Sequence, residues 1–344
     1  MSANSFDPSI DSLPQILAAA LERRIELIDT RHENAFRLFS GFYEGYPDLV
    51  VDLYARTLVI FDYSENPLPS SSIVQIASSL YLKRLPWLRA VILKAHHAAQ
   101  PEMRRGVVIH GTAPDRHITE NGIRYGLDLL LNQDASFYLD TGNLRRWATE
   151  NLGGKRVLNT FAYTGSLGVA ARAGGARQVI HLDANRKFLN LAKASYALNG
   201  FPINKADFIT GDFWEVTSRL RHSGELYDCV ILDPPFFAAS KRGRVDLLTE
   251  SMQLINKVRS LVGHEGYLAV VNNALFLGGA EFMKTIEDVC SSGYLNLERI
   301  IPVPDDVAIP LQNRIQSPPA DPAPFNHSTK IVILRVERKD RRKA

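Results

Sequence analysis

Acidic and aromatic side chains follow consecutive strand-like segments in the C-terminal two-thirds of the chain. Asp183 ends one such segment, and Asp212 with Phe213 follows the next. In an open parallel α/β sheet, ligands bind beyond the carboxyl ends of the strands. The first carboxylate can accept hydrogen bonds from ribose hydroxyls, and the second from an adenine amine, while the aromatic ring covers the base. These residues therefore predict a nucleoside-binding pocket.

The turn before them indicates which nucleoside. A strand-like segment ends at Phe161 and runs into a turn in which Gly165 permits a tight bend and Ser166 can begin a helix. An NAD-dependent oxidoreductase needs Gly-x-Gly-x-x-Gly beneath a pyrophosphate, whereas this turn offers one glycine with bulky Phe161 and Tyr163. S-adenosylmethionine has no phosphate. The turn favours it as the cofactor and leaves an NAD enzyme as the weaker alternative.

A second motif, Asp233-Pro234-Pro235-Phe236, directly follows an apolar segment. The two prolines fix the backbone and leave the carbonyls of Asp233 and Pro234 available as acceptors. Asp233 adds a carboxylate, and Phe236 or Phe237 offers a flat ring. Such a turn can orient a flipped nucleobase beside a reactive methyl group. We therefore expect Asp233, Pro234, Pro235 and Phe236 to be catalytic, with Phe237 against the base.

Cations follow this motif. Lys241 and Arg242 lie in the next loop and could hold RNA phosphates, with an ordinary solvated loop as the alternative. The last ten residues carry six basic and two acidic side chains. This tail could also bind phosphates, although a solvated chain end is the favoured interpretation.

The elements that must position these residues alternate at the spacing of βαβ units, which predicts a parallel sheet. The expected strands span residues 156–161, 178–183, 207–210, 227–233, 267–272, 297–303 and 331–336. The expected helices span residues 141–152, 185–198, 213–221, 245–262 and 279–291, with one more starting at Ser166. The proline-rich connection 304–329 is too long for a simple turn, so we expect it to be functional or mobile.

The N-terminal part has a different pattern. It predicts an amphipathic helix over 12–29, a second helix over 71–82, and strands over 49–54, 58–63, 90–95 and 106–110. Asn121-Gly122 indicates a hairpin. Because 344 residues exceed what one hydrophobic core usually supports, we expect two domains. These are a small α+β domain over 1–125 and a catalytic α/β domain over 126–344.

Composition limits the class of protein. Hydrophobic residues make up 45% and charged residues 22%, which is ordinary for a globular protein. No apolar run is long enough for a membrane helix and no secretory signal is visible, so we expect a soluble cytoplasmic protein. Cys229 and Cys290 lie in apolar segments, and the histidines show no ligand spacing, so we expect neither disulfides nor a metal site.

Residues 127–337 resemble the class I ribosomal RNA methyltransferases of the large-subunit type, which modify 23S RNA with S-adenosylmethionine. The resemblance is carried by Phe137-Tyr138-Leu139-Asp140 with Arg145-Arg146, the run from Val157 to Ser166, Asp183, Leu198-Asn199-Gly200 and Asp233-Pro234-Pro235. Residues 37–52 are similar to the domain that precedes catalysis in those enzymes. The family often also begins with a PUA RNA-binding domain, for which this chain leaves no room.

The resemblance implies a Rossmann-like class I fold, S-adenosylmethionine as cofactor, and RNA as the partner, with ribosomal RNA favoured. It implies that the cofactor is bound by Thr160, Phe161, Tyr163, Thr164, Gly165, Asp183 and Asp212. Residues 137–140 would form a lid strand near the cofactor, which makes Phe137, Tyr138 and Asp140 candidate substrate contacts. A catalytically silent RNA-binding or assembly protein of the same fold remains an alternative.

The sequence also allows a prediction of which atom of the base is methylated. Enzymes that methylate carbon-5 of a pyrimidine first add a cysteine thiolate to the ring, and the relatives that make 5-methylcytosine carry that cysteine just after the fifth strand. The corresponding stretch here, residues 270–276, contains no cysteine. Its Asn272-Asn273 pair resembles the branch that makes 7-methylguanine. We therefore expect methylation of a nitrogen, guanine first, with a cytosine-C5 enzyme as the alternative.

Overall fold

The computed structural model describes residues 10–65, 67, 71–235, 237–240, 243–246 and 250–344. The chain divides into two compact units, each assembled from two segments. Unit 1 comprises residues 1–139 and 305–317, and unit 2 comprises residues 140–304 and 318–344. The predicted boundary after residue 125 differs from this division, because residues 126–139 and part of the proline-rich connection belong to unit 1.

Unit 1 is built on a five-stranded sheet in the order β1-β2-β3-β4-β5, with β3 parallel to β4 and the other neighbours antiparallel. Its strands are β1 (Ala35–Ser40), β2 (Leu49–Tyr54), β3 (Thr57–Asp62), β4 (Ala90–Ala95) and β5 (Val107–Gly111). Helices α1 (Leu13–Glu22) and α2 (Ser72–Arg84) bury their apolar sides against the sheet. The remaining elements are α3 (Pro101–Arg105) and the predicted hairpin, β6 (His117–Glu120) with β7 (Ile123–Gly126).

Two predictions for unit 1 need correction. The helix expected over 12–29 ends at Glu22, because Ile25 and Leu27 are about half exposed and gain little from continuing the buried stripe. Strand β1 was not predicted, since Arg37 interrupts its apolar pattern. Arg37 pairs instead with Asp52 of β2, with 2.8 Å between Nε and Oδ1.

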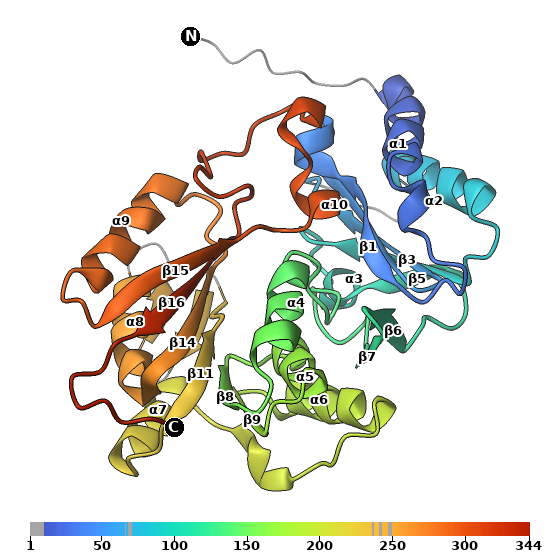
Figure 1. Cartoon of the computed structure of the whole chain (residues 1–344). Helices are drawn as coiled ribbons and strands as arrows, with labels where there is room; N and C mark the ends of the chain where they lie inside the picture. Colours follow the sequence, from blue (N-terminus) through green and yellow to red (C-terminus); the bar gives the residue numbers. More distant parts are fainter. Residues whose placement is uncertain (1–9, 66, 68–70, 236, 241–242, 247–249) are drawn as a thin grey trace. The chain divides into compact units, whose positions relative to one another are not determined.

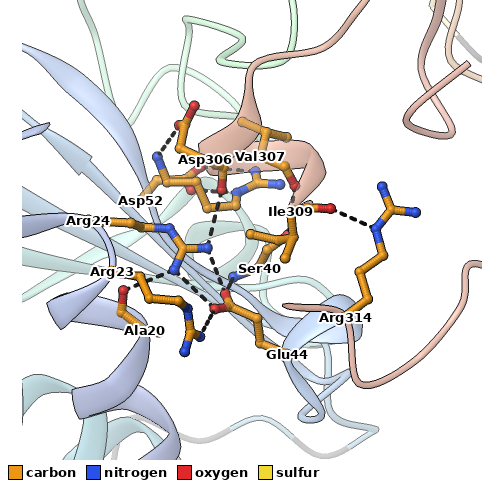
Figure 2. Close-up of polar contacts among 11 residues, drawn as sticks. Ala20, Arg23, Arg24, Ser40, Glu44, Asp52, Asp306, Val307, Ile309 and Arg314 are labelled. Carbon is orange, nitrogen blue, oxygen red and sulfur yellow. Dashed lines mark hydrogen bonds and ion pairs between the residues drawn. The ribbon is translucent and has the colours of Figure 1, made fainter. Parts of the chain in front are cut away.

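Residues 305–317 belong to unit 1, and Figure 2 shows polar contacts that tie this segment to the rest of the unit. The short helix α10 (Asp305–Ala308) lies beside β1, where the Asp306 carboxylate accepts the backbone N–H of Arg37 at 2.9 Å. The Ser40 hydroxyl donates to the Val307 carbonyl at 3.0 Å. This half of the proline-rich connection is therefore a structural part of unit 1.

A buried ion pair lies beneath this segment. Glu44 is 1% exposed and accepts both guanidinium nitrogens of Arg24 at 3.0 and 2.8 Å, as well as the Ser40 N–H at 2.7 Å. Arg24 also donates to the Asp306 carbonyl at 3.3 Å. Burial alone would raise the pKa of Glu44. The charge of Arg24 and these hydrogen bonds lower it by more than burial raises it, so the pKa lies below its ordinary value.

Unit 2 is built on a seven-stranded sheet in the order β10-β9-β8-β11-β14-β16-β15, in which β16 runs antiparallel to both neighbours. Its strands are β8 (Arg156–Thr160), β9 (Gln178–Asp183), β10 (Phe208–Thr210), β11 (Tyr227–Leu232), β14 (Val262–Asn272), β15 (Leu295–Ile301) and β16 (Lys330–Val336). Its helices are α4 (Gly142–Asn151), α5 (Ser166–Ala173), α6 (Arg186–Leu198), α7 (Phe213–His222), α8 (Ser251–Val258) and α9 (Gly279–Cys290). Helices α4 to α6 cover one face of the sheet, and α7 to α9 cover the other (Figure 1).

The helix expected over 245–262 is shorter: α8 spans Ser251–Val258 and is followed by a 3-10 turn over Arg259–Leu261. The backbone before α8 forms a hairpin, β12 (Phe237–Ser240) with β13 (Gly243–Asp246). Strand β14 begins at Val262 and bends at Gly266, where an added Cβ would lie 2.8 Å from the Asp228 carbonyl oxygen. The expected helix therefore began too early, and the strand expected over 267–272 starts earlier, at Val262. In the part of the chain that the structure describes, no helix is long and apolar enough to cross a membrane.

The Glu44 ion pair gives a first prediction. Replacing Glu44 by alanine leaves the Arg24 guanidinium buried without its partner, which we expect to destabilise unit 1 by about 3 kcal/mol. Hydrogen exchange of the full chain should show faster opening in residues 35–44 and 305–317. The matched control is Glu22→Ala, because Glu22 is exposed and 4.0 Å from Arg84. Equal exchange in the two variants would contradict the prediction.

Candidate active site

The parallel strands of unit 2 bring the predicted residues to one edge of the sheet. Thr160 at the end of β8 is level with Leu232 of β11 and Leu182 of β9, and Asp183 is level with Thr210 of β10. The residues that follow these strands therefore lie at the same edge. They include the turn 161–165, Asp183, Asp212 and Asp233.

The turn after β8 has an unusual backbone. Phe161, Tyr163 and Gly165 adopt positive φ angles of 51°, 50° and 80°, a region that side chains disfavour. The Tyr163 N–H donates to Asp183 Oδ2 at 2.7 Å, which ties the turn to β9. At Gly165, a Cβ would lie 2.5 Å from the Ala192 side chain, so the close approach of α6 requires glycine.

Asp183 holds this turn and keeps acceptor capacity. Its other oxygen, Oδ1, accepts the Asn185 N–H at 2.8 Å. Burial raises the pKa of Asp183, although the two backbone N–H groups partly offset this effect. Because a carboxylate offers about four lone-pair positions, each oxygen can still accept a ribose hydroxyl. The predicted role of Asp183 is therefore compatible with its structural role.

The other predicted cofactor residues divide into exposed and supporting groups. Asp212 caps α7, with Oδ1 accepting the N–H groups of Trp214 and Glu215 at 2.9 and 3.1 Å. Phe213 is 6% exposed and stacks on Phe161 at 4.5 Å between ring centroids, so the less buried Phe161 is the ring nearer to solvent.

Thr160, Thr164 and Ser166 support the turn. Thr160 is fully buried, and its hydroxyl donates to the Ile231 carbonyl at 2.7 Å, which joins β8 to β11. Thr164 is also buried, and Ser166 is the first residue of α5. These three residues shape the backbone around the pocket.

The carboxylate that follows β11, Asp233, is influenced by the charge of a second carboxylate, Asp140. Asp233 accepts no hydrogen bond from any residue that the structure describes. Burial and the charge of Asp140 together raise the pKa of Asp233 to about 7. Asp140 is held by Thr329, whose hydroxyl donates to Asp140 Oδ2 at 2.7 Å. Sequence reasoning missed Thr329, since a single threonine at the start of the last strand carries no recognisable signal.

The predicted substrate contacts are distributed over both units and over residues that the structure does not describe. Phe137 and Tyr138 belong to unit 1, where Phe137 packs on Tyr125 and the Tyr138 hydroxyl donates to Asp134 at 3.0 Å. Phe236, Lys241 and Arg242 lie outside the described residues, and Phe237 is described only by its backbone in β12. Asp140 is the predicted substrate contact in unit 2 whose side chain the structure describes.

The C-terminal tail lies at the opposite end of the sheet. Arg338 donates to the carbonyls of Ser260 and Val262, and Lys343 pairs with Glu265 at 2.8 Å. These residues lie at the start of β14, and ten residues of strand span about 33 Å. Both tail cations are thus engaged within unit 2, away from the candidate site.

His181, in β9, has a structural role. His181 is fully buried, and burial lowers its pKa to about 3, so it is neutral. Its Nε2 lies 3.1 Å from the Tyr196 hydroxyl, and its ring stacks on Phe208. Among the described residues, no group of three or more His, Cys, Asp or Glu side chains is placed to hold a metal ion.

The chain is similar to known proteins in sequence and fold. Residues 91–307 match the model of a family described as S-adenosylmethionine-dependent methyltransferase. The chain is 31% identical over 258 residues to the ribosomal RNA large subunit methyltransferase I of Photobacterium profundum, and 32% identical over 256 residues to that of Aeromonas salmonicida. Each match covers 72% of this chain and 64% of the relative's length.

A solved structure shares the fold. SMU.776, whose crystal structure was solved in complex with SAH, superposes with a TM-score of 0.82 at 20% identity. The superposition covers 98% of this chain and 83% of the other. Together with the sheet order, this likeness confirms the predicted Rossmann-like α/β fold.

The carboxylate pair gives a second prediction. Asp140→Asn removes a negative charge near Asp233, so the pKa of Asp233 should fall by about one, equivalent to about 1.4 kcal/mol. Carboxyl ¹³C NMR titration of the purified protein measures this value. Asp212→Asn is the control, because Asp212 does not contribute to the shift. An unchanged Asp233 titration in Asp140→Asn would show that the two carboxylates are not coupled.

Proposed function

The chain belongs to the S-adenosylmethionine-dependent methyltransferase family, and from this premise we propose that it methylates a base of RNA, ribosomal RNA first, on a nitrogen atom. The observation that carries the proposal is the convergence of the Tyr163–Asp183 turn and the Asp233 carboxylate at one sheet edge. The turn suits a nucleoside cofactor, and the Asp233 carboxylate suits a base. The similarity to ribosomal RNA large subunit methyltransferases supports RNA as the substrate.

We propose that different residues bind different parts of the cofactor. Asp183 would accept the ribose hydroxyls, Asp212 Oδ2 would accept the adenine amine, and Phe161 would cover the adenine ring. When bound, the cofactor supplies an electrophilic methyl group on a sulfonium. The turn 161–165 has one glycine, which suits a ligand without phosphates better than a dinucleotide.

The base would be held at the other end of this edge. Pro234 is buried and Pro235 exposed, and their rigid backbone leaves the carbonyls of Asp233 and Pro234 as acceptors for the base. The Asp233 and Asp140 carboxylates would accept N–H groups of guanine. Catalysis would then consist mainly of placing a nucleophilic nitrogen against the methyl group and excluding water.

The cysteines support nitrogen over carbon-5. Cys229 is fully buried in β11, and burial raises the pKa of its thiol well above the ordinary value. Cys290 lies at the end of α9, where burial also raises the thiol pKa. A thiolate nucleophile is required to activate carbon-5 of a pyrimidine. Neither thiol is suited to that step, whereas a guanine nitrogen has its own lone pair.

Cofactor binding gives a third prediction. Asp183→Ala removes both the ribose acceptor and the anchor of Tyr163, so S-adenosylmethionine should bind at least about tenfold more weakly, or about 1.4 kcal/mol. Isothermal titration calorimetry measures this affinity. Asp207→Ala is the control, since Asp207 accepts from Gln178 at 2.8 Å, before β10. Wild-type affinity in Asp183→Ala would remove Asp183 from the site.

The choice of atom gives a fourth prediction. A folded protein carrying both Cys229→Ala and Cys290→Ala should keep methyl transfer within about threefold of wild type, because neither thiol attacks the base. RNA containing 5-fluorocytosine should not trap the wild-type protein covalently. A complex that survives denaturing electrophoresis would instead support the cytosine-C5 alternative.

A further inference from the structure

The hydrogen bond between Thr329 and Asp140 joins residues 189 positions apart. Both lie in unit 2. Thr329 is 5% exposed and precedes β16, and Asp140 lies just before α4. The bond therefore connects the residue before β16 to the segment just before α4.

The alternation of side chains places this bond on the same face as Asp233. In β16, Ile331 and Ile333 face the core beneath α4 and α5, so Thr329 points to that face. In β11, Cys229 and Ile231 face the same core, and Asp233 continues their series. Asp140 reaches this face from the start of α4. The charge of Asp140 is felt at Asp233, which agrees with this placement.

Hydrogen bonds fix the backbone of Thr329 and the residue that follows Asp140. The Thr329 N–H donates to His327 Nδ1 at 3.0 Å, and the next residue, Lys330, pairs with Asn272 of β14. On the other side, Thr141 accepts the Arg145 N–H at 3.0 Å and the Arg145 guanidinium at 2.8 Å. Thr329 can therefore impose a fixed position on the Asp140 carboxylate.

A fixed Asp140 side chain matters because Asp233 is a second carboxylate. Two neighbouring carboxylates repel each other when both are ionised, and this repulsion favours side-chain positions of Asp140 farther from Asp233. The Thr329 hydroxyl occupies Asp140 Oδ2, and Oδ1 accepts no hydrogen bond from the described residues. The oxygen that remains available is thus the one that a ligand beside Asp233 can use.

We propose that Thr329 is a positioning residue for the target base: its hydroxyl holds Asp140 against the repulsion of Asp233, so that Asp140 Oδ1 accepts an N–H group of the base. The inference rests on the proposed function, because the base is the ligand. It assigns Thr329 no contact with the cofactor. Loss of the hydroxyl should therefore affect methyl transfer while the affinity for S-adenosylmethionine is unchanged.

The test uses the full chain with labelled S-adenosylmethionine and unmodified ribosomal RNA. Thr329→Val keeps the shape of the side chain and removes the hydroxyl, and should lower kcat/KM for RNA at least about tenfold. Thr329→Ser keeps the hydroxyl and should stay within about threefold of wild type. Thr217→Val is the matched control, since Thr217 is also fully buried and donates to a carbonyl in α7.

A double-mutant cycle separates positioning from a general loss of structure. If Thr329 acts through Asp140, Thr329→Val and Asp140→Asn should cost similar factors, and combining them should cost little more than either alone. Multiplicative losses, or full activity in Thr329→Val, would overturn the inference while leaving the proposed function intact. A changed cofactor affinity in Thr329→Val would also overturn it.

A wild-type protein that methylates no RNA would overturn the proposed function. In that case the geometric claim is decided by crystal structures of both variants. Asp140 should keep one side-chain position in Thr329→Ser and lose it in Thr329→Val. An Asp140 side chain that stays in place in Thr329→Val would overturn the positioning role.

Discussion

The hydrogen bond from the Tyr163 N–H to the Asp183 carboxylate is the contact on which the pocket depends. Three residues of the turn have positive φ, and such backbone costs of order 1–3 kcal/mol at each non-glycine position. The turn is stable because Asp183, at the end of β9, accepts its N–H group, and because Gly165 has no side chain that would clash with Ala192 of α6. Strand order, turn and helix packing are therefore linked at one place.

The charges at this edge fit the proposed cofactor. Asp183, Asp140 and Asp233 bring carboxylates to the ends of adjoining elements, and burial or mutual repulsion raises the pKa of Asp183 and Asp233. A ligand with a positive sulfonium is favoured in such surroundings, whereas a pyrophosphate is repelled. Thr329 matters for the same reason: its hydroxyl is the donor that holds the Asp140 carboxylate while Asp233 repels it.

Local patterns were sufficient to predict most of unit 2. Apolar strands that end in Asp183 or Asp233, with glycine or proline after them, carry their boundaries and their ligand edge in the sequence. Long-range pairing was not predictable in this way. Arg37 lies in a strand because Asp52 faces it, Thr329 matters because Asp140 lies beside it, and Asp306 belongs to unit 1 because β1 leaves an N–H for its carboxylate. The helix expected over 245–262 was too long, because the local pattern does not show that the chain up to Asp246 forms a strand.

The central claim is that the pocket delivers a methyl group to a nitrogen of an RNA base. Its most direct test is to incubate the protein with isotopically labelled S-adenosylmethionine and unmodified ribosomal RNA, digest the RNA to nucleosides and identify the labelled product by mass spectrometry. The account predicts a guanosine methylated on nitrogen, with 7-methylguanosine first. Labelled 5-methylcytidine would contradict the choice of atom, and RNA without label would contradict the claim as a whole.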